Sequence, residues 1–278
     1  MPHDQPYSMM TANLVRPVHV RHVSPEGTAS RADVVATEEP LEVRIDGEPF
    51  AVIMRTPGSD RELAIGFLFA ERVILSASDI DSIERDPQSR NVTNVRIRDV
   101  RAHDLAARQI DRRRVVMTAS CGLCGRVTIE SLRVEAPEIT ADWTIAAGLI
   151  ATLPDALRGA QAVFDETGGL HAAGLFARSG DIETVAEDVG RHNAVDKIVG
   201  RMLLDNRVPL ARSILFVSGR TSYEIVQKAF LAGIPMVCAV SAPSSLAVEL
   251  AEEAGITLLG FVRGSTFNLY SHGRRVIA

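Results

Sequence analysis

Short apolar runs alternate with helical periods through the second half of the chain. The runs "SILFV" (213–217), "PMVCAV" (235–240) and "ITLLGFV" (256–262) have the length and composition of buried strands. Between them, "SYEIVQKAFLAG" and "SSLAVELAEEAG" show the apolar spacing of amphipathic helices, and each ends at a glycine. Alternation of this kind predicts an α/β layer built on a mainly parallel sheet.

The first half of the chain has a different pattern. "LEVRIDGEPFAVIMRT" alternates around Asp46-Gly47, which predicts a β-hairpin. Ser59 followed by Glu62 predicts a capping box and a helix from about Asp60. "TIAAGLIATLPDAL" (144–157) predicts a further helix. We therefore expect three parts: an irregular lead-in over 1–39, a small α+β domain over 40–135 and an α/β domain over 136–278.

Composition excludes some classes of protein. The chain has 278 residues and a net charge of −5, without the basic excess typical of nucleic-acid binders. No apolar run reaches the roughly 18 residues that a membrane span needs. The first 20 residues lack the apolar core of a signal peptide. We expect a cytoplasmic protein with no nucleic-acid or membrane partner.

The stretch "TASCGLCGRV" contains two of the three cysteines, Cys121 and Cys124. In a reducing compartment such a pair is more often metal-binding or catalytic than a structural disulfide. Positively charged neighbours lower the pKa of a thiol, and four arginines flank the pair: Arg112, Arg113, Arg114 and Arg126. This pattern is typical of a reactive thiol loop.

Spacing alone leaves other roles for this pair open. A structural zinc site needs two more ligands, and His171, His192, Cys238 or an acidic residue would have to supply them. No second Cys-x-x-Cys is present to do so. A thioredoxin-like site belongs early in a βαβ unit, whereas this pair lies in mid-chain. An inert pair is the remaining alternative.

Polar residues follow each predicted strand of the second half. Ser218, Gly219 and Arg220 follow one strand, and Ser241 follows the next. His192 lies in "EDVGRHNAVDKIVG", at another junction of strand and helix. Ligands bind at the carboxyl ends of strands in α/β sheets, and helix amino ends favour phosphate. A shared phosphate-binding pocket is one interpretation; capping by Asp188 or Asn193 beside solvated neighbours is the other.

Several segments together resemble one family. "SCGLCG", "TGGLHAAGLF", "EDVGRHNAVDKIVG", "SGRTSYEIVQKA", "GIPMVCAVSAPSSLAVELAEEAGITLLGF" and "FNLY" occur in order over about residues 40–275. They resemble the formate dehydrogenase accessory sulfurtransferases (FdhD). The resemblance implies a sulfur carrier that takes persulfide sulfur from a cysteine desulfurase. It would pass that sulfur to the molybdenum or tungsten bis-guanine-dinucleotide cofactor used by formate dehydrogenase.

The resemblance also implies roles for single residues. Cys121 matches the persulfide carrier, and Cys124 matches a second cysteine whose role stays open. The segment assigned to cofactor binding is Phe261, Val262, Arg263, Gly264, Ser265 and Thr266. With Ser218, Gly219, Arg220, Ser241 and His192, it is expected to hold the cofactor, which a GDP-like nucleotide would mimic. Similar proteins are cytoplasmic homodimers, and the implied partners are the desulfurase and formate dehydrogenase.

The family further resembles the cytidine-deaminase fold, which implies a three-layer C-terminal domain. Zinc deaminases carry His-x-Glu and Pro-Cys-x-x-Cys. Here "HAA" places Ala173 where that glutamate would be, and "SGRTS" lacks the cysteine pair. Zinc-activated water chemistry is therefore not expected, and no metal is expected. The alternative functions are a non-catalytic cofactor chaperone with a structural zinc or inert cysteines, and a thiol–disulfide oxidoreductase.

Overall fold

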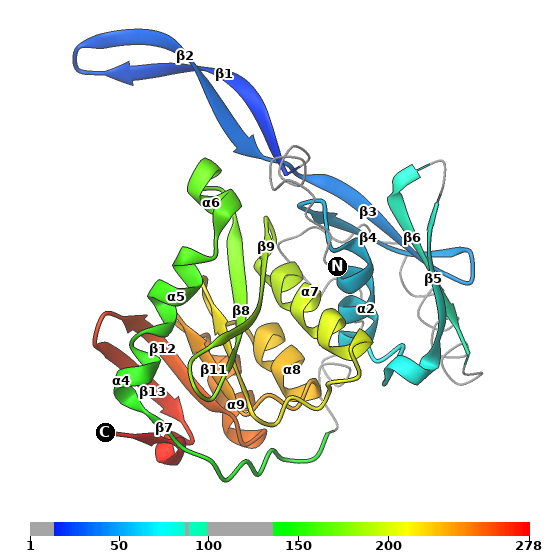
Figure 1. Cartoon of the computed structure of the whole chain (residues 1–278), viewed down its shortest axis with the longest axis vertical. Helices are drawn as coiled ribbons and strands as arrows, with labels where there is room; N and C mark the ends of the chain where they lie inside the picture. The colour runs from blue at the N-terminus through cyan, green and yellow to red at the C-terminus, as the bar shows by residue number, and fades with distance from the viewer. Residues whose placement is uncertain (1–13, 87–88, 99–135) are drawn as a thin grey trace, which may run out of the picture.

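The largest layer of the protein is a six-stranded sheet with the order β13-β12-β11-β10-β8-β9 (Figure 1). The computed structural model describes residues 14–86, 89–98 and 136–278. The strands are β8 (His171–Ala177), β9 (Ile182–Asp188), β10 (Ser213–Val217), β11 (Met236–Ala239), β12 (Thr257–Arg263) and β13 (Thr266–Ser271).

The predicted mainly parallel sheet is wrong. Only the pairs β10–β11 and β11–β12 are parallel among the strands of this sheet, and the other three pairs are antiparallel. For the pairs β8–β9 and β12–β13 the reason is local. The turns after β8 and β12 are too short for a crossover, and a strand that returns through a tight turn must run antiparallel to its neighbour.

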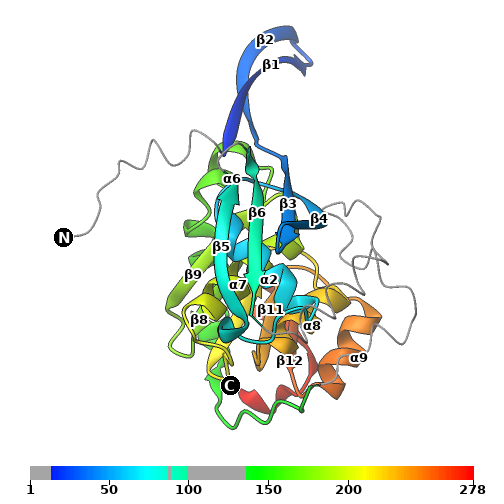
Figure 2. The ribbon, with the colours of Figure 1, turned by 90° about the vertical axis from the view of Figure 1, so that its right-hand side faces the viewer.

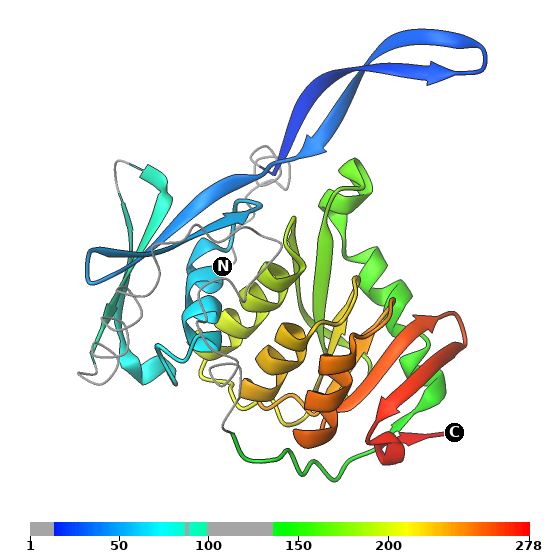
Figure 3. The ribbon, with the colours of Figure 1, turned by 180° about the vertical axis from the view of Figure 1, so that it is seen from behind.

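Helices cover both faces of this sheet. One face carries α7 (Arg191–Leu204), α8 (Tyr223–Leu231) and α9 (Ser245–Glu253), which Figure 3 shows side by side. On the other face lie α4 (Ala147–Ile150) and α5 (Leu153–Gly159), followed by α6 (Ala162–Thr167). Strand β8 shows the division: Ala173 and Leu175 belong to one core, and Ala172 and Phe176 to the other. The sheet is therefore the middle of three layers.

The helix predicted over 144–157 is interrupted. This segment forms the short strand β7 (Ile145–Ala146), then α4 and the start of α5. Pro154 lies in the first turn of α5, where its missing N–H leaves no helical hydrogen bond unmade. β7 pairs in parallel with β14 (Val276–Ile277), which follows the 3-10 helix η3 (Gly273–Arg275). The break is thus fixed by a proline and by pairing with the far end of the chain.

A second, four-stranded sheet has the order β4-β3-β6-β5. Its strands are β3 (Glu39–Ile45), β4 (Glu48–Arg55), β5 (Ile80–Asp86) and β6 (Ser89–Ile97). The predicted hairpin at Asp46-Gly47 is confirmed, and both turn residues have positive φ angles. Between β4 and β5 lie α2 (Asp60–Ala70) and the 3-10 helix η1 (Ala77–Asp79).

The start of α2 is confirmed at Asp60, but its predicted capping box is wrong. Ser59 takes a left-handed conformation with φ 53°, and its side chain caps nothing. The Ser59 hydroxyl instead accepts a hydrogen bond from Arg201 Nη2 at 3.3 Å, on α7. A tertiary contact has replaced the local one.

Helices α2 and α7 join the two sheets through backbone contact (Figure 2). A Cβ atom added at Gly66 would lie 2.0 Å from the carbonyl oxygen of Asp196. One added at Gly200 would lie 1.9 Å from the carbonyl oxygen of Glu62. Because glycine alone permits this approach, residues of both sheets share one hydrophobic core, which runs from Leu41 to Leu258.

The lead-in predicted as irregular contains a long hairpin. Strands β1 (Val15–Ser24) and β2 (Gly27–Ala36) pair along their whole length and project beyond the rest of the protein (Figure 1). Most of their residues are exposed. A strand with two solvated faces lacks apolar alternation, and so its sequence gave no periodic signal.

Candidate functional site

The loops after β10 and β11 meet the last residues of β12 at the end of the large sheet where these three strands finish, here called the strand-end edge. Val240 N–H donates to Val217 O at 3.2 Å, and Phe261 N–H donates to Ser241 O at 3.2 Å. Thr221 also forms an isolated parallel bridge with Pro243. The predicted meeting of polar segments at the strand ends is therefore present in the fold, because parallel strands end at the same edge.

Ser218 and Gly219 continue this edge toward β8. The Ser218 hydroxyl accepts the backbone N–H of Ala172 at 2.9 Å. A Cβ atom at Gly219 would lie 3.3 Å from Nδ1 of His171 and 3.7 Å from Cδ of Arg191. The missing side chain of Gly219 thus lets the strand-end loop lie against this histidine and arginine. Arg220, next along the chain, is exposed.

A cavity of about 590 Å³ opens beside Ser218 and His171. Its opposite wall comes from α5 and α6. Arg158 lies over the ring of Phe164 at 4.6 Å, and Gln161 is buried with 4% exposure. The lining residues are Pro154, Asp155, Leu157, Arg158, Gln161, Phe164, Gly168, Gly169, Leu170, His171, Ser218 and Val240. A cavity of this size, lined by both apolar and polar groups, is in the range of small-molecule sites.

His192 lies at the start of α7, on the face of the sheet opposite to α5 and α6. Its Nε2 atom is 2.8 Å from the Ser222 hydroxyl and 3.3 Å from Oε2 of Glu224. Burial, with the nearby Lys228 and Arg191, lowers the pKa of His192 to about 3. The ring is therefore neutral at neutral pH. A carboxylate partner favours the proton on Nε2, which leaves Nδ1 as an acceptor.

Three buried polar atoms at the strand-end edge have no hydrogen-bond partner among the described residues, and one of them is Nε of Arg191. Neither Nδ1 of His192 nor the hydroxyl of Thr221 hydrogen-bonds to any residue that the structure describes. Thr221 is 1% exposed and His192 is 4% exposed. Buried polar groups without a partner are uncommon and costly, so these two atoms are candidates for ligand contact.

His171 is the second neutral histidine of the site. It is half-buried and lines the 590 Å³ cavity. Burial and the charge of Arg191 lower its pKa, against the opposing effect of Asp188. The site thus carries its positive charge on arginines and not on its histidines.

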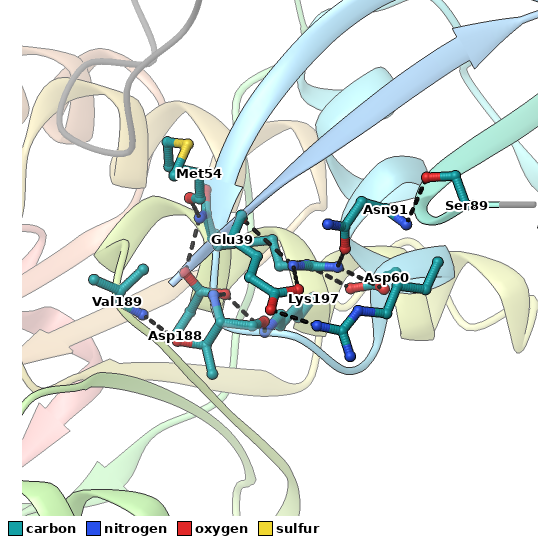
Figure 4. A network of polar contacts seen from close by, with 12 residues as sticks. Glu39, Met54, Asp60, Ser89, Asn91, Asp188, Val189 and Lys197 are labelled. Carbon is teal, nitrogen blue, oxygen red and sulfur yellow. Dashed lines mark hydrogen bonds and ion pairs between the residues drawn. The ribbon is translucent and has the colours of Figure 1, made fainter. Parts of the chain in front are cut away.

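A network of polar contacts around Asp188 holds the segment that leads into α7 (Figure 4). Its Oδ1 accepts Gly190 N–H and Asn193 Nδ2, each at 2.8 Å. Its Oδ2 accepts Thr56 N–H at 3.1 Å and forms an ion pair with Lys197 Nζ at 2.7 Å. Asp188 and Asn193 therefore act as structural residues and not as a ligand rim, but neither caps α7, whose start has no side-chain cap hydrogen bond.

The segment 261–266 comprises the last three residues of β12, the turn residues Gly264 and Ser265, and the first residue of β13. Phe261 is 37% exposed and has φ 54°, and Gly264 has φ 53°. Arg263 Nε donates to Val240 O at 3.0 Å. The Val262 side chain is fully buried in the core, so it can offer a ligand only its backbone. Ser265 and the Thr266 backbone complete the turn, with Thr266 paired to Arg263.

Cys121 and Cys124 lie outside the described residues, as do the four flanking arginines. Cys238 is fully buried, and burial raises the pKa of its thiol. A thiol kept protonated in a core is unreactive. Within the described ranges, no group of three or more His, Cys, Asp or Glu residues is placed to hold a metal ion.

Sequence reasoning missed part of this site. Thr221 and Ser222 follow a predicted strand, and the strand-end rule could have found them. Gln161 and Phe164 carry no such signal, because only tertiary packing brings α5 and α6 to the sheet edge.

Comparison with known proteins decides the family. The FdhD/NarQ family model matches residues 36–277. The chain belongs to the FdhD/NarQ family. Its relatives in this family include the sulfur carrier protein FdhD of Nocardia farcinica, 49% identical over 92% of this chain and 93% of the relative. That of Sulfurisphaera tokodaii is 45% identical over 95% of this chain and 99% of the relative.

A solved structure agrees with this family membership. The crystal structure of a proposed formate dehydrogenase accessory protein from Desulfotalea psychrophila has a TM-score of 0.76 and 26% identity. The match covers 95% of this chain and all of that one. In the part of the chain that the structure describes, no helix is both long and apolar enough to cross a membrane.

Proposed function

We propose that this member of the FdhD/NarQ family is a sulfur carrier and sulfurtransferase. It takes persulfide sulfur from a cysteine desulfurase and passes it to the molybdenum or tungsten bis-guanine-dinucleotide cofactor that formate dehydrogenase needs. Relatives named sulfur carrier protein support the first half of this proposal. The observation that carries the second half is the strand-end edge with the 590 Å³ cavity beside it.

The edge and the cavity suit the two ends of a nucleotide. The cavity offers an aromatic ring, Phe164, and the buried amide of Gln161 to a planar base. The strand-end loops offer Gly219 and the exposed guanidinium of Arg220 to phosphates. A further arginine, Arg263, lies at the end of β12. The cofactor is thus the substrate of this site.

We also propose a specific fold for residues 136–278. The strand order β9-β8-β10-β11-β12, between two helical layers, supports a cytidine-deaminase-like arrangement of residues 136–278. In that arrangement His192 and Thr221 occupy the amino ends of neighbouring helices. Their atoms without a partner among the described residues are available to a ligand bound there.

The transfer itself is assigned to Cys121. Its thiolate attacks the sulfane sulfur of the desulfurase persulfide, which gives a Cys121 persulfide and releases the desulfurase thiolate. Attack by the Cys124 thiolate on the inner sulfur of Cys121 would then release hydrosulfide and leave a Cys121–Cys124 disulfide. In the alternative without a second cysteine, the outer sulfur would pass directly to the cofactor, which would supply the two electrons that reduce it, and the Cys121 thiolate would be released. We also propose that the protein works in the cytoplasm as a homodimer.

Mass spectrometry of Cys121 tests the carrier assignment. After incubation with a cysteine desulfurase and cysteine, we expect Cys121 to gain the mass of one sulfur atom. The Cys121→Ala variant should not restore formate dehydrogenase activity in cells that lack the protein, whereas Cys238→Ala should. Full activity of Cys121→Ala would remove the assignment.

A cofactor chaperone without sulfur chemistry is the competing function. It predicts one zinc per chain that is lost when both Cys121 and Cys124 are replaced, and no sulfur gain on Cys121. Metal analysis of the purified protein beside the mass measurement separates the two functions. A thiol–disulfide oxidoreductase would instead reduce disulfides and would leave the cavity unexplained.

A further inference from the structure

A second cavity opens at the opposite end of the large sheet. Its volume is about 820 Å³. It lies where β8 ends and β10 begins. The candidate site described above lies at the other end of β10. The lining residues are Ala177, Arg178, Ser179, Glu183, Arg207, Pro209, Leu210, Ala211, Arg212 and Ser213. None of them belongs to the candidate site described above.

This cavity has an excess of positive charge. Three guanidinium groups line it, and Glu183 is the only carboxylate in its lining. That carboxylate already forms an ion pair with Arg207. Arg178 and Arg212 make no ion pair with any residue in the described ranges. Two arginines are therefore left to face the solvent-filled space, and their field attracts anions.

Arg178 is held in place by an aromatic ring. Its guanidinium carbon lies 5.4 Å from the ring centre of Trp143, within the range of a cation–π contact. The Arg178 Nε atom is buried and has no hydrogen-bond partner among the described residues. Trp143 is itself fixed, since its Nε1 donates to Ala211 O at 2.8 Å on the cavity wall. The ring contact thus orders the guanidinium of Arg178 at the cavity wall, where its terminal N–H groups would be the donors to a bound acceptor.

We propose that this cavity binds an acidic segment of a protein partner. Paired N–H groups of arginine recognise carboxylates in a fork geometry, and two arginines on separate segments would engage two acidic side chains. The apolar atoms of Leu210, Pro209 and Ala177 would contact the stems of those side chains. The space is much larger than one phosphate or carboxylate, which favours a peptide over a lone inorganic anion.

The position of this cavity would allow a partner protein and a small molecule to be bound at the same time. A partner held here would leave the strand-end edge and its 590 Å³ cavity free for a second molecule. The proposal does not depend on the sulfurtransferase function. It would hold for any activity of the strand-end site.

Trp143 provides the measurement, because it is the only tryptophan of the chain. A short peptide rich in Glu and Asp is titrated into the full-length protein at low salt, and Trp143 fluorescence is followed. We expect a saturable change that weakens as salt rises. The double variant Arg178→Ala/Arg212→Ala should bind at least ~10-fold more weakly. Loss of Arg178 also removes its contact with Trp143, so the Trp143 fluorescence of the free variant changes. The affinity of the variant is therefore measured from the anisotropy of a labelled peptide.

The matched control is Arg96→Ala/Arg98→Ala, which removes two exposed arginines of the small sheet. It should bind the peptide as the wild type does. Equal loss in both double variants would show general charge attraction and overturn the site. So would the absence of peptide binding, or pyrophosphate binding that requires Arg178 while the peptide fails to compete.

Discussion

The backbone N–H of Thr56 donates a hydrogen bond to the Asp188 carboxylate at 3.1 Å, across 132 residues of sequence. Both residues are buried. Through this contact the end of β4 holds the turn that starts α7, four residues before His192. The Thr56 hydroxyl accepts Val189 N–H at 3.1 Å, and its carbonyl accepts Lys197 Nζ at 2.9 Å. The small sheet thus positions the functional edge of the large one.

Removing the charge of Asp188 should destabilise the protein strongly. Asp188→Asn leaves Lys197 as a buried charge without its carboxylate, and breaking a buried ion pair from one side costs about 3–5 kcal/mol. Urea unfolding measures the change. Asp81→Asn is the control, because its ion pair with Arg98 is exposed and should contribute less than about 1 kcal/mol. Equal losses in the two variants would contradict the anchoring role of Asp188.

The glycine contact between α2 and α7 should tolerate no methyl group. Gly200→Ala would place Cβ 1.9 Å from Glu62 O, so the two helices must move apart. We expect a loss of about 3 kcal/mol or more in the free energy of unfolding. Gly148→Ala adds a methyl group where no atom lies within 4 Å, and it should leave stability unchanged or slightly higher. Thermal unfolding of both variants tests the difference.

Burial of neutral His192 should make stability depend on pH. Its pKa is lowered from 6.5 to about 3 by burial and nearby cations, so between these values the unfolded chain binds a proton that the folded chain does not. Stability therefore falls as pH drops from 6.5 toward 3, by up to about 1.4 kcal/mol per pH unit from this group.

The variant His192→Gln removes this titration. Its free energy of unfolding should fall less steeply than that of the wild type between pH 6 and pH 4, because the variant binds about one proton fewer on unfolding. Urea unfolding at several pH values gives the slopes. His22→Gln, on exposed β1, controls for the loss of one histidine. Parallel slopes for His192→Gln and the wild type would exclude a buried neutral His192.

The hydroxyl of Thr221 should matter to a ligand and not to folding. Thr221→Val removes a buried hydroxyl without a described partner, so the free energy of unfolding should stay the same or rise by up to about 1 kcal/mol. If this hydroxyl contacts the cofactor, GDP affinity falls by roughly tenfold. Calorimetric titration with GDP measures the affinity.

Thr257→Val is the matched control for this variant. Thr257 is fully buried too, but its hydroxyl donates to His272 O at 2.7 Å and accepts from Arg275 at 3.0 Å. Its removal should cost about 1–3 kcal/mol of stability and leave GDP affinity unchanged. The reverse pattern, with Thr221→Val unfolding the protein, would indicate a structural hydroxyl.

Much of the local structure could be predicted from the sequence. Asp46-Gly47 allowed the tight turn it was expected to make, and the apolar runs 213–217 and 256–262 became buried strands. Prediction failed where local signals were overridden or missing. Pro154 divided an expected helix, Ser59 gave its hydroxyl to Arg201 on another element, and the solvated β1–β2 hairpin showed no alternation.

The sequence by itself determined most of the element types, the polar strand ends and the family, because turn chemistry, periodicity and motifs act over neighbouring residues. Only the tertiary structure decided which groups meet. It brought Gln161 and Ser218 to one cavity, left Nδ1 of His192 and the Thr221 hydroxyl without a partner among the described residues, and gathered Arg178 and Arg212 around a second opening. Such contacts join residues far apart in the chain, and their geometry depends on how whole helices pack on the sheet.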